Sequence, residues 1–551
     1  MTGTAKHVCT FAGVALIGVH SALFPVLGSQ CKGTSLSVRV KAPTSAEHLT
    51  MRVEVPKEIR SRVKTFLNGR PADLSKASAG PGMHRAEWRV RYAGGFERRV
   101  GFTQLVGPFQ DPDKPPCAVR LFVGQSFIDD GKQSPGTAVA MVKDIIVKQM
   151  EDFKQWPIGK FKEIRELRAQ WVGMGNKKWS EDLHTTITFE NLKNLPSGYF
   201  GLTSTIRLDD GAVHLKIAIV PRIKGKEIDL KAYVEADVKL DNRVYNWVAA
   251  KLDIDDRVAS EVQSELRGAM ADVFTLPPPV PLPGKRKLSF RYCPGAKLQI
   301  KDGSYAMIPV AIQLDGAHPG VLPISLGYAK SAAAKKRDHM APLSFEFELE
   351  AINSVLYYLW HSNFLDEHLK KAGRIEERFN ENSIVKELLS IRLENVRLSL
   401  PPTATATGYK RTEGPPFQIA AAATMDIRDG KTTTKANIFS TIGFDFVGSD
   451  ARKAVAKLTF RKLHVTCEPE PGLLKPCYAD IVEVMRNRSD ALHGELTRQF
   501  TKTFNALVID RYIGNDESVA GFQIDNAKVT ATPSGRTGII RVDIFGKIKA
   551  D

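Results

Sequence analysis

The residues whose types could support catalysis are scattered along the 551-residue chain instead of forming motifs. Gly124-Gln125-Ser126 begins like a nucleophile elbow, but Ile128 stands where that turn needs its second glycine. There is no phosphate-binding glycine loop and no dinucleotide fingerprint. Asp253, Asp255 and Asp256 resemble part of a calcium loop but lack its glycine and terminal glutamate, which favours helix capping. We therefore expect a non-enzyme with no cofactor and no bound metal.

The cysteines allow several pairings. Cys467 and Cys477 flank a Glu-Pro-Glu-Pro-Gly turn, so a disulfide between them would close a short loop. Cys117 and Cys293 can pair if Cys31 carries a lipid; otherwise one thiol is free, or Cys31 pairs with Cys117. No C-x-x-C or H-x-x-x-H spacing occurs, which argues against zinc. The residues alone leave these alternatives open.

The first thirty residues have the layout of a secretory signal. Lys6 and His7 precede an apolar run over residues 8–27, and small residues follow it. This predicts a signal segment over 1–30 and an exported protein, periplasmic or at the cell surface. A buried N-terminal helix is the alternative. A lipid anchor at Cys31 is a further option, although Gly28-Ser29-Gln30 fits the lipobox poorly.

The chain is strongly basic, with a net charge of +17 and a pI near 9.4, which favours anionic partners. Nucleic acid is a poor candidate because the basic clusters lack interleaved aromatic residues and the chain has an export signal. Solvated loops are the alternative interpretation of these clusters. The clusters that could meet a lipid head group are Lys285, Arg286, Lys287, Lys335, Lys336 and Arg337.

The elements that would position such residues follow a repeating order. Residues 32–116 alternate apolar and polar side chains around Gly94-Gly95, which predicts a small all-β domain. After it, the order strand, helix, antiparallel strands, helix, strand occurs twice, with matching helices 210–230 residues apart. This spacing suggests two copies of one α+β domain, over 117–284 and 343–551, joined by central strands at 285–342. Chance similarity of two α+β halves is the alternative.

Each predicted helix has a wide apolar face that must be buried against something. If helix and curved sheet stand slightly apart, the gap is a groove that can hold acyl chains, each methylene contributing about 0.8 kcal/mol. If they mesh, the same faces are simply core. The candidate groove residues are Val139, Val142, Ile146, Met150, Val258, Val262, Leu266, Ile352, Val355, Leu359, Leu492, Leu496 and Phe500.

This duplicated plan resembles the tubular lipid-binding superfamily, the family of bactericidal permeability-increasing protein and its bacterial relatives. Phe345–Leu359 looks like the strand-then-helix entry of such a domain, and Pro277–Pro283, followed by a strand from Lys287, looks like the join between its halves. The resemblance covers residues 117–551 and implies two barrels sharing a central sheet, with lipid in apolar grooves. The Cys467–Cys477 pair matches the family's structural disulfide loosely, and the domain at 32–116 departs from the plan.

The sequence thus predicts an α+β fold with two tandem helix-plus-curved-antiparallel-sheet (half-barrel) domains, preceded by a small all-β domain. The leading functional hypothesis is an exported protein that binds lipid or lipopolysaccharide, with a membrane surface as a further partner. The alternative is an envelope interaction or adhesin-type protein without a lipid ligand, in which residues 32–116 carry the function. A hydrolase of unknown type is the third hypothesis.

Overall fold

The structure is a computed structural model. It describes residues 23–25, 29–31, 34–36, 39–41, 45–49, 52–54, 63–91, 97–111, 117–134, 137–152, 160–173, 198–224, 227–241, 276, 279–282, 285–293, 295, 298–315, 322, 324–325, 341–367, 391–407, 417–429, 432–449, 453–468, 522–533 and 539–550.

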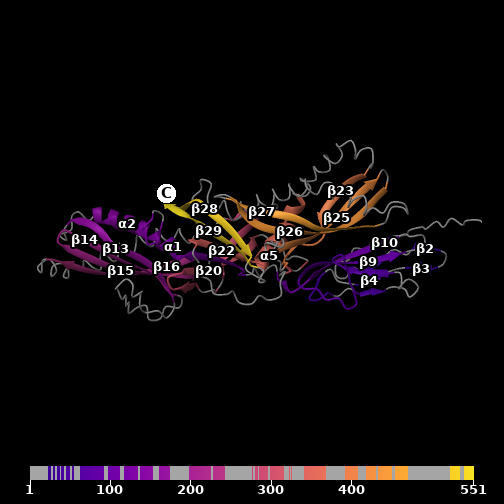
Figure 1. The fold of residues 1–551 in the computed structure, drawn as a ribbon, viewed down its shortest axis with the longest axis horizontal. Coiled ribbons are helices and arrows are strands. Elements are labelled where there is room, and N and C mark those ends of the chain that lie inside the picture. The colour runs from indigo at the N-terminus through magenta and orange to yellow at the C-terminus, as the bar shows by residue number, and fades with distance from the viewer. Residues whose placement is uncertain are drawn as a thin grey trace, which may run out of the picture.

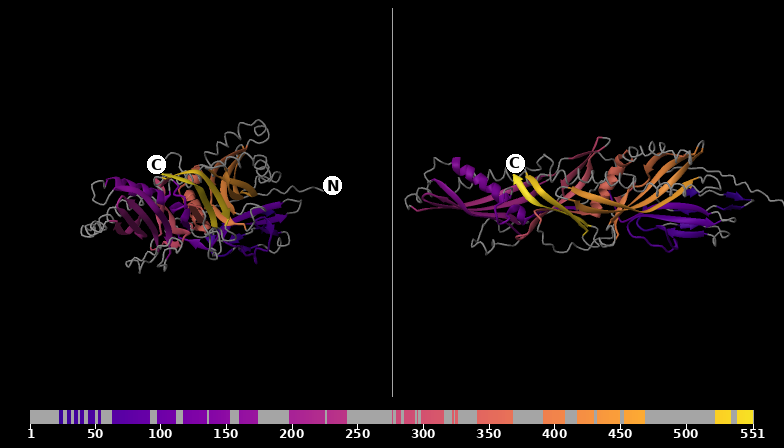
Figure 2. Two further views of the ribbon diagram at one scale, coloured as in Figure 1. Left: turned by 60° about the vertical axis from the view of Figure 1, so that its left-hand side comes forward. Right: turned by 45° about the horizontal axis from the view of Figure 1, so that its top comes forward.

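The described part of the molecule is elongated and consists mostly of antiparallel strands (Figure 1). One sheet lies at each end and a third lies between them, while the N-terminal strands run beside the sheet at one end. Both views in Figure 2 show the same arrangement. The predicted curved, antiparallel, sheet-rich character is therefore confirmed. The predicted domain boundaries stay predictions.

The central sheet takes strands from all three segments predicted after residue 116. Its order is β17-β18-β20-β12-β22-β29-β28, with β19 beside β20. The middle pair, β12 and β22, is antiparallel, and each strand leads directly into a helix, as the switch of apolar period predicts. The strands are β12 Val119–Gly124, β17 Val280–Leu282, β18 Arg286–Tyr292, β19 Gln299–Lys301, β20 Tyr305–Asp315, β22 Leu343–Glu348, β28 Phe522–Pro533 and β29 Ile539–Ala550.

Two backbone hydrogen bonds close the ends of the β12–β22 pair in the same way. Gly124 N–H donates to Pro342 O at 2.8 Å, and Glu348 N–H donates to Ala118 O at 2.9 Å. The two donors are 224 residues apart, and so are the two acceptors. This offset falls within the 210–230 residues expected for the duplicated domains. The duplication itself stays a prediction that this symmetry supports.

The first end sheet, which we call the first sheet, is a four-stranded meander covered by helix α2, Ala138–Asp152. Thr137 caps the start of α2, because its Oγ1 accepts the Ala140 N–H at 3.2 Å. A two-residue turn joins β14 to β15, and Gly211 adopts φ +153°, where a Cβ would overlap Lys239 O. The strands are β13 Phe161–Val172, β14 Tyr199–Leu208, β15 Gly211–Lys224 and β16 Glu227–Leu240.

The sheet at the other end, which we call the second sheet, follows helix α5, Leu349–His361. Its order is β23-β25-β26-β27, with β24 also paired to β25. The strands are β23 Ile391–Leu398, β24 Thr403–Ala406, β25 Phe417–Asp429, β26 Thr432–Ser449 and β27 Lys453–Glu468. One continuous apolar core, which we call the main core, runs from the first sheet through the central sheet to Phe417 and Phe444 here.

The N-terminal region contains short strands and one larger sheet, of order β5-β10-β9-β7-β8. The predicted hairpin is confirmed, because β9 and β10 pair in continuous antiparallel register. The bounds are β1 Leu23–Pro25, β2 Ser29–Cys31, β3 Thr34–Leu36, β4 Arg39–Lys41, β5 Ser45–Ala46, β6 Arg52–Glu54, β7 Val63–Leu67, β8 Arg70–Pro71, β9 Gly82–Arg91 and β10 Glu97–Val106, while β11 Phe109–Gln110 pairs with β21 Ile324–Ser325.

The β9–β10 hairpin docks on the second sheet, on the face opposite the main core. A separate apolar cluster, which we call the docking core, joins Met83 and Leu105 to Ala420, Ala422 and Phe439. Both faces of β25 are therefore buried in its first half: Phe417 and Ile419 belong to the main core, while Ala420 and Ala422 belong to the docking core.

Buried polar contacts surround the docking core. The Arg85 guanidinium donates through Nη2 to Thr466 Oγ1 at 2.7 Å, and Arg85 is only 2% exposed. Glu87 Oε2 lies 3.7 Å from His464 Nδ1, and its Oε1 accepts from Arg89 at 2.6 Å. Burial alone would raise the pKa of Glu87, but the contacts with His464 and Arg89 and the charge of Arg85 outweigh it and hold the pKa at about 2. This polar ring fixes the position of the hairpin.

Candidate functional site

The predicted groove face of α2 is fully packed over its described part. Val139, Val142 and Ile146 are 0%, 2% and 1% exposed, and all three belong to the main core. Such low exposure leaves no room for a water-sized probe beside these side chains, let alone for an acyl chain. In the first half, these three residues are therefore core. The Met150 side chain and Val258, Val262 and Leu266 lie outside the described residues.

The predicted groove face of α5 differs, because part of it remains accessible. Leu359 is 6% exposed and buried, whereas Ile352 and Val355 are only partly buried. Leu492, Leu496 and Phe500 lie outside the described residues. The partly buried apolar residues of α5, the turn after it and the second sheet, all packed against the main core, are Ile352, Val355, Trp360, Phe364, Leu365, Ala406 and Ile442.

Helix α5 is held on the second sheet by a side-chain amide that makes the two backbone hydrogen bonds a neighbouring strand would make. Asn353 Nδ2 donates to Ala404 O at 3.0 Å, and Asn353 Oδ1 accepts the Ala404 N–H at 2.6 Å. These bonds satisfy the outer edge of β24 where it would otherwise be buried without partners. The distance between α5 and the sheet is thereby fixed.

In the first half, a side-chain amide likewise bonds the backbone of an edge strand. Gln125, from the sequence that resembled a nucleophile elbow, opens the short helix α1, Gln125–Ile128. Its Nε2 donates to Ala169 O at 2.7 Å, and its Oε1 accepts the Trp171 N–H at 3.1 Å. Gln125 is thus a structural clamp on β13. Sequence reasoning missed both clamps because their partners are backbone groups distant in the chain.

The three basic residues of the predicted head-group cluster at the start of β18 have different surroundings. Arg286 donates through Nη1 to His361 O at 2.7 Å and so caps the C-terminal end of α5, where a cation is favoured. Lys285 and Lys287 on either side of it are exposed. Lys335, Lys336 and Arg337 lie outside the described residues.

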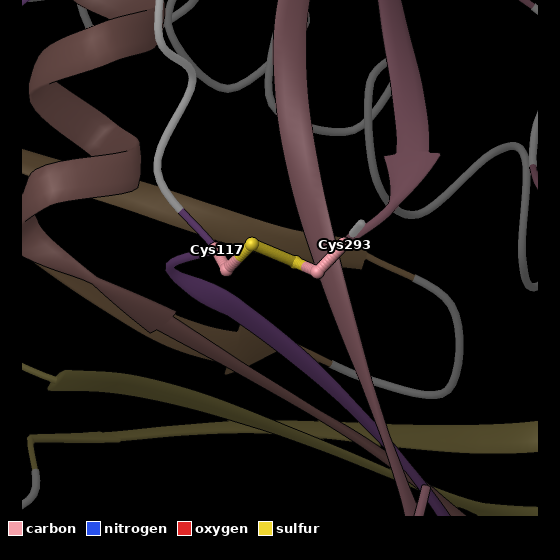
Figure 3. Close-up of a disulfide and its surroundings, with 2 residues drawn as sticks. All are labelled: Cys117 and Cys293. Carbon is pink, nitrogen blue, oxygen red and sulfur yellow. A yellow bond between two sulfur atoms is a disulfide. The ribbon is translucent and has the colours of Figure 1, made fainter. Parts of the chain in front are cut away.

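One disulfide is present among the described residues, between Cys117 and Cys293, with a Cα–Cα distance of 5.8 Å (Figure 3). Cys117 lies two residues before β12, and Cys293 directly follows β18. This is one of the pairings that the sequence left open. For the predicted Cys467–Cys477 bond, Cys467 is the penultimate residue of β27 and pairs with Ala436, and Cys477 lies outside the described residues.

Two kinds of site are absent from the described residues. There, no group of three or more His, Cys, Asp or Glu side chains converges in a way that could hold a metal ion. Within that same part of the chain, no helix has the length and apolar character needed to cross a membrane.

A comparison with solved structures gives a distant similarity. No protein-family model matches the sequence, and no curated protein matches it. The fold is similar to the crystal structure of lipopolysaccharide binding protein, with 10% sequence identity and a TM-score of 0.34. The match covers 80% of this chain and 99% of that chain. At this TM-score the similarity carries no argument about function, so the function must be argued from the residues themselves.

Proposed function

We propose that this chain is a non-enzymatic binding protein for an amphipathic ligand such as a lipid, whose apolar part lies on α5 beside the second sheet. The observation that carries the proposal is the contrast between the two helices. The described candidate residues of α2 are buried completely, whereas Ile352 and Val355 of α5 keep partial exposure within an otherwise apolar surround. Exposed apolar surface that is contiguous and bounded by a core is typical of a ligand site.

The rigidity of this surface supports binding. Asn353 holds α5 on β24, and Arg286 caps the end of the helix, so the apolar surface is formed before a ligand arrives. A preformed site avoids the entropic cost of ordering side chains on binding. Each methylene buried there contributes about 0.8 kcal/mol, so a chain of several methylenes gives useful affinity.

We also propose that the protein is exported, to the periplasm or the cell surface. The apolar run over residues 8–27 is the first support for this proposal. The Cys117–Cys293 bond is the second, because structural disulfides persist mainly in oxidising compartments.

The decisive experiment is native mass spectrometry of gently purified protein, together with uptake of a fluorescent fatty acid. We expect co-purifying lipid and saturable uptake. The variant Val355→Asn should weaken uptake about tenfold or more, because it replaces partly accessible apolar surface with an amide. Ile164→Asn is the matched control, since Ile164 is also partly buried against the main core but lies on β13.

Two results would reject the proposal. One is a folded protein that carries no lipid and takes up none, which would favour the interaction role without a lipid ligand. The other is equal uptake by Val355→Asn and Ile164→Asn, which would show that α5 is not the binding surface.

A further inference from the structure

A polar cavity of about 460 Å³ opens beside the turn that follows α5. Its walls come from three places: that turn, the bulged end of β23, and the facing parts of β25 and β26. The volume lies within the range of about 300–1,000 Å³ that is usual for small-molecule sites. Nothing in the sequence pointed to it, because its lining residues are spread from Asn363 to Lys435.

The walls of the cavity are fixed by hydrogen bonds. Leu398 N–H donates to Asp366 Oδ1 at 2.9 Å, and Trp360 Nε1 donates to Leu398 O at 3.2 Å, so β23 is tied to the end of α5. On the opposite wall, Asn395 Nδ2 donates to Asp426 Oδ2 at 2.8 Å. The carboxyl groups of Asp366 and Asp426 are thus held in place, each with one oxygen that has no part in these bonds. A site prepared in this way can orient a ligand without first reorganising.

The charges in the lining decide the chemistry of the ligand. Three carboxyl groups, those of Asp366, Glu367 and Asp426, face two cations, Arg397 and Lys435. A bare phosphate would meet more negative than positive charge. A group that carries hydroxyls and an amine can donate to the carboxylates and also accept from the cations, and hydrogen bonds to charged partners are the strong ones.

The cavity also adjoins apolar surface. In the turn after α5, Asn363 and Asp366 line the cavity, while Phe364 and Leu365 between them pack, partly buried, against the main core. The polar cavity therefore lies just beyond the C-terminal end of α5, the helix that carries the partly exposed Ile352 and Val355. An amphipathic molecule needs such a boundary between apolar and polar surface.

We infer that this cavity holds the polar head of the amphipathic ligand, and that this head is an uncharged or cationic group rich in hydroxyl and amine donors. The inference deepens the proposed function and rests on it for the apolar tail. It moves the head-group site away from the basic cluster at Lys285–Lys287 and changes the expected charge of the head group.

The test uses the full chain and three soluble probes without a tail: glucosamine, glucose and inorganic phosphate. Ligand-observed NMR titrations should show saturable binding in the order glucosamine, then glucose, with phosphate weakest. The double variant Glu367→Gln, Asp426→Asn should weaken glucosamine binding about tenfold, since it removes two charged acceptors. Asp229→Asn, an exposed carboxylate on β16, is the control and should leave binding unchanged.

Three outcomes would overturn the inference: tighter binding of phosphate than of glucosamine, no saturable binding of any probe, or equal effects of the double variant and Asp229→Asn. Circular dichroism and urea unfolding establish that each variant is folded. Fatty acid uptake is measured on the same samples, so the two proposals can fail separately. Lost probe binding with normal uptake rejects only the head-group cavity, whereas normal probe binding without uptake rejects only the apolar site.

Discussion

At the scale of single residues, the structure depends on side chains that replace missing backbone partners. Asn353 and Gln125 each give both amide atoms to an edge strand. Composition and periodicity cannot reveal such a role, because the partner is a main-chain group whose identity leaves no mark in the sequence. Gln125 instead drew attention only through its likeness to a catalytic turn.

Replacing Asn353 with alanine should lower the free energy of unfolding by about 3 kcal/mol. The change leaves the N–H and C=O of Ala404 buried without the amide, and each unsatisfied group costs about 1–3 kcal/mol. Urea unfolding measures the effect. Ser75→Ala, which removes an exposed side-chain bond to Asp73, is the control and should change the free energy by less than about 0.5 kcal/mol. A similar loss for both variants would contradict the clamp.

Glu87 should make the free energy of unfolding depend on pH in the acid range. Its folded-state pKa of about 2 lies below the ordinary value of 4.5, so its contribution is complete above about pH 4.5 and disappears as the pH falls towards 2. The gap corresponds to about 3 kcal/mol. The difference in unfolding free energy between the wild type and Glu87→Gln should therefore shrink from pH 6 to pH 2. A difference that is constant over this range would show that Glu87 is not paired as described.

At the scale of elements, the apolar period located the strand-to-helix switches that begin both halves, and the hairpins β9–β10 and β14–β15. Alternation of apolar residues along β25 can predict only one buried face, the face that carries Phe417 and Ile419. The second face is buried because the hairpin docks there, and a contact between segments more than three hundred residues apart has no local signal. For the same reason, the sequence could not distinguish the packed α2 from the partly open α5.

Gly101 on β10 has a definite part in this docking. A Cβ at position 101 would overlap the guanidinium of Arg85, which must stay in place to bond Thr466. We expect Gly101→Ala to displace Arg85 and to lower the free energy of unfolding by about 1–3 kcal/mol. Gly80→Ala is the matched control, because a Cβ there meets nothing within 4 Å and its effect should be small. Chemical denaturation measures both effects. Equal free energies of unfolding for the two variants would show that Arg85 has room to move.

At the scale of the whole molecule, the C-terminal end of the chain returns to the middle (Figure 1). Strands β28 and β29, from the C-terminal end, complete the central sheet that β12 and β22 begin. The sequence predicted that a central set of strands joins the two halves, but the pairing of the last strand, β29, with β22 depends on contacts between segments distant in the chain. The polar cavity could not be predicted at all, since it forms only where three such segments come together.

The Cys117–Cys293 bond constrains this architecture over a sequence separation of 176 residues. A loop of that length, when closed, removes unfolded-state entropy worth up to about 5 kcal/mol. Reduction should therefore lower the unfolding midpoint of the wild type markedly. The double variant Cys117→Ser, Cys293→Ser should start at the lower midpoint and not respond to reductant. If the wild type were equally insensitive, the bond would not be stabilising the fold.

The docking of the β9–β10 hairpin has a practical consequence for anyone who shortens this chain. Removing residues 1–116 as an accessory module would expose Phe439, Ala420 and Ala422 to water, together with Thr466 and His464 that now face the hairpin. Such a truncated protein would expose an apolar sheet surface, and we expect it to self-associate. Recombinant versions made for crystallography or screening should therefore keep the hairpin.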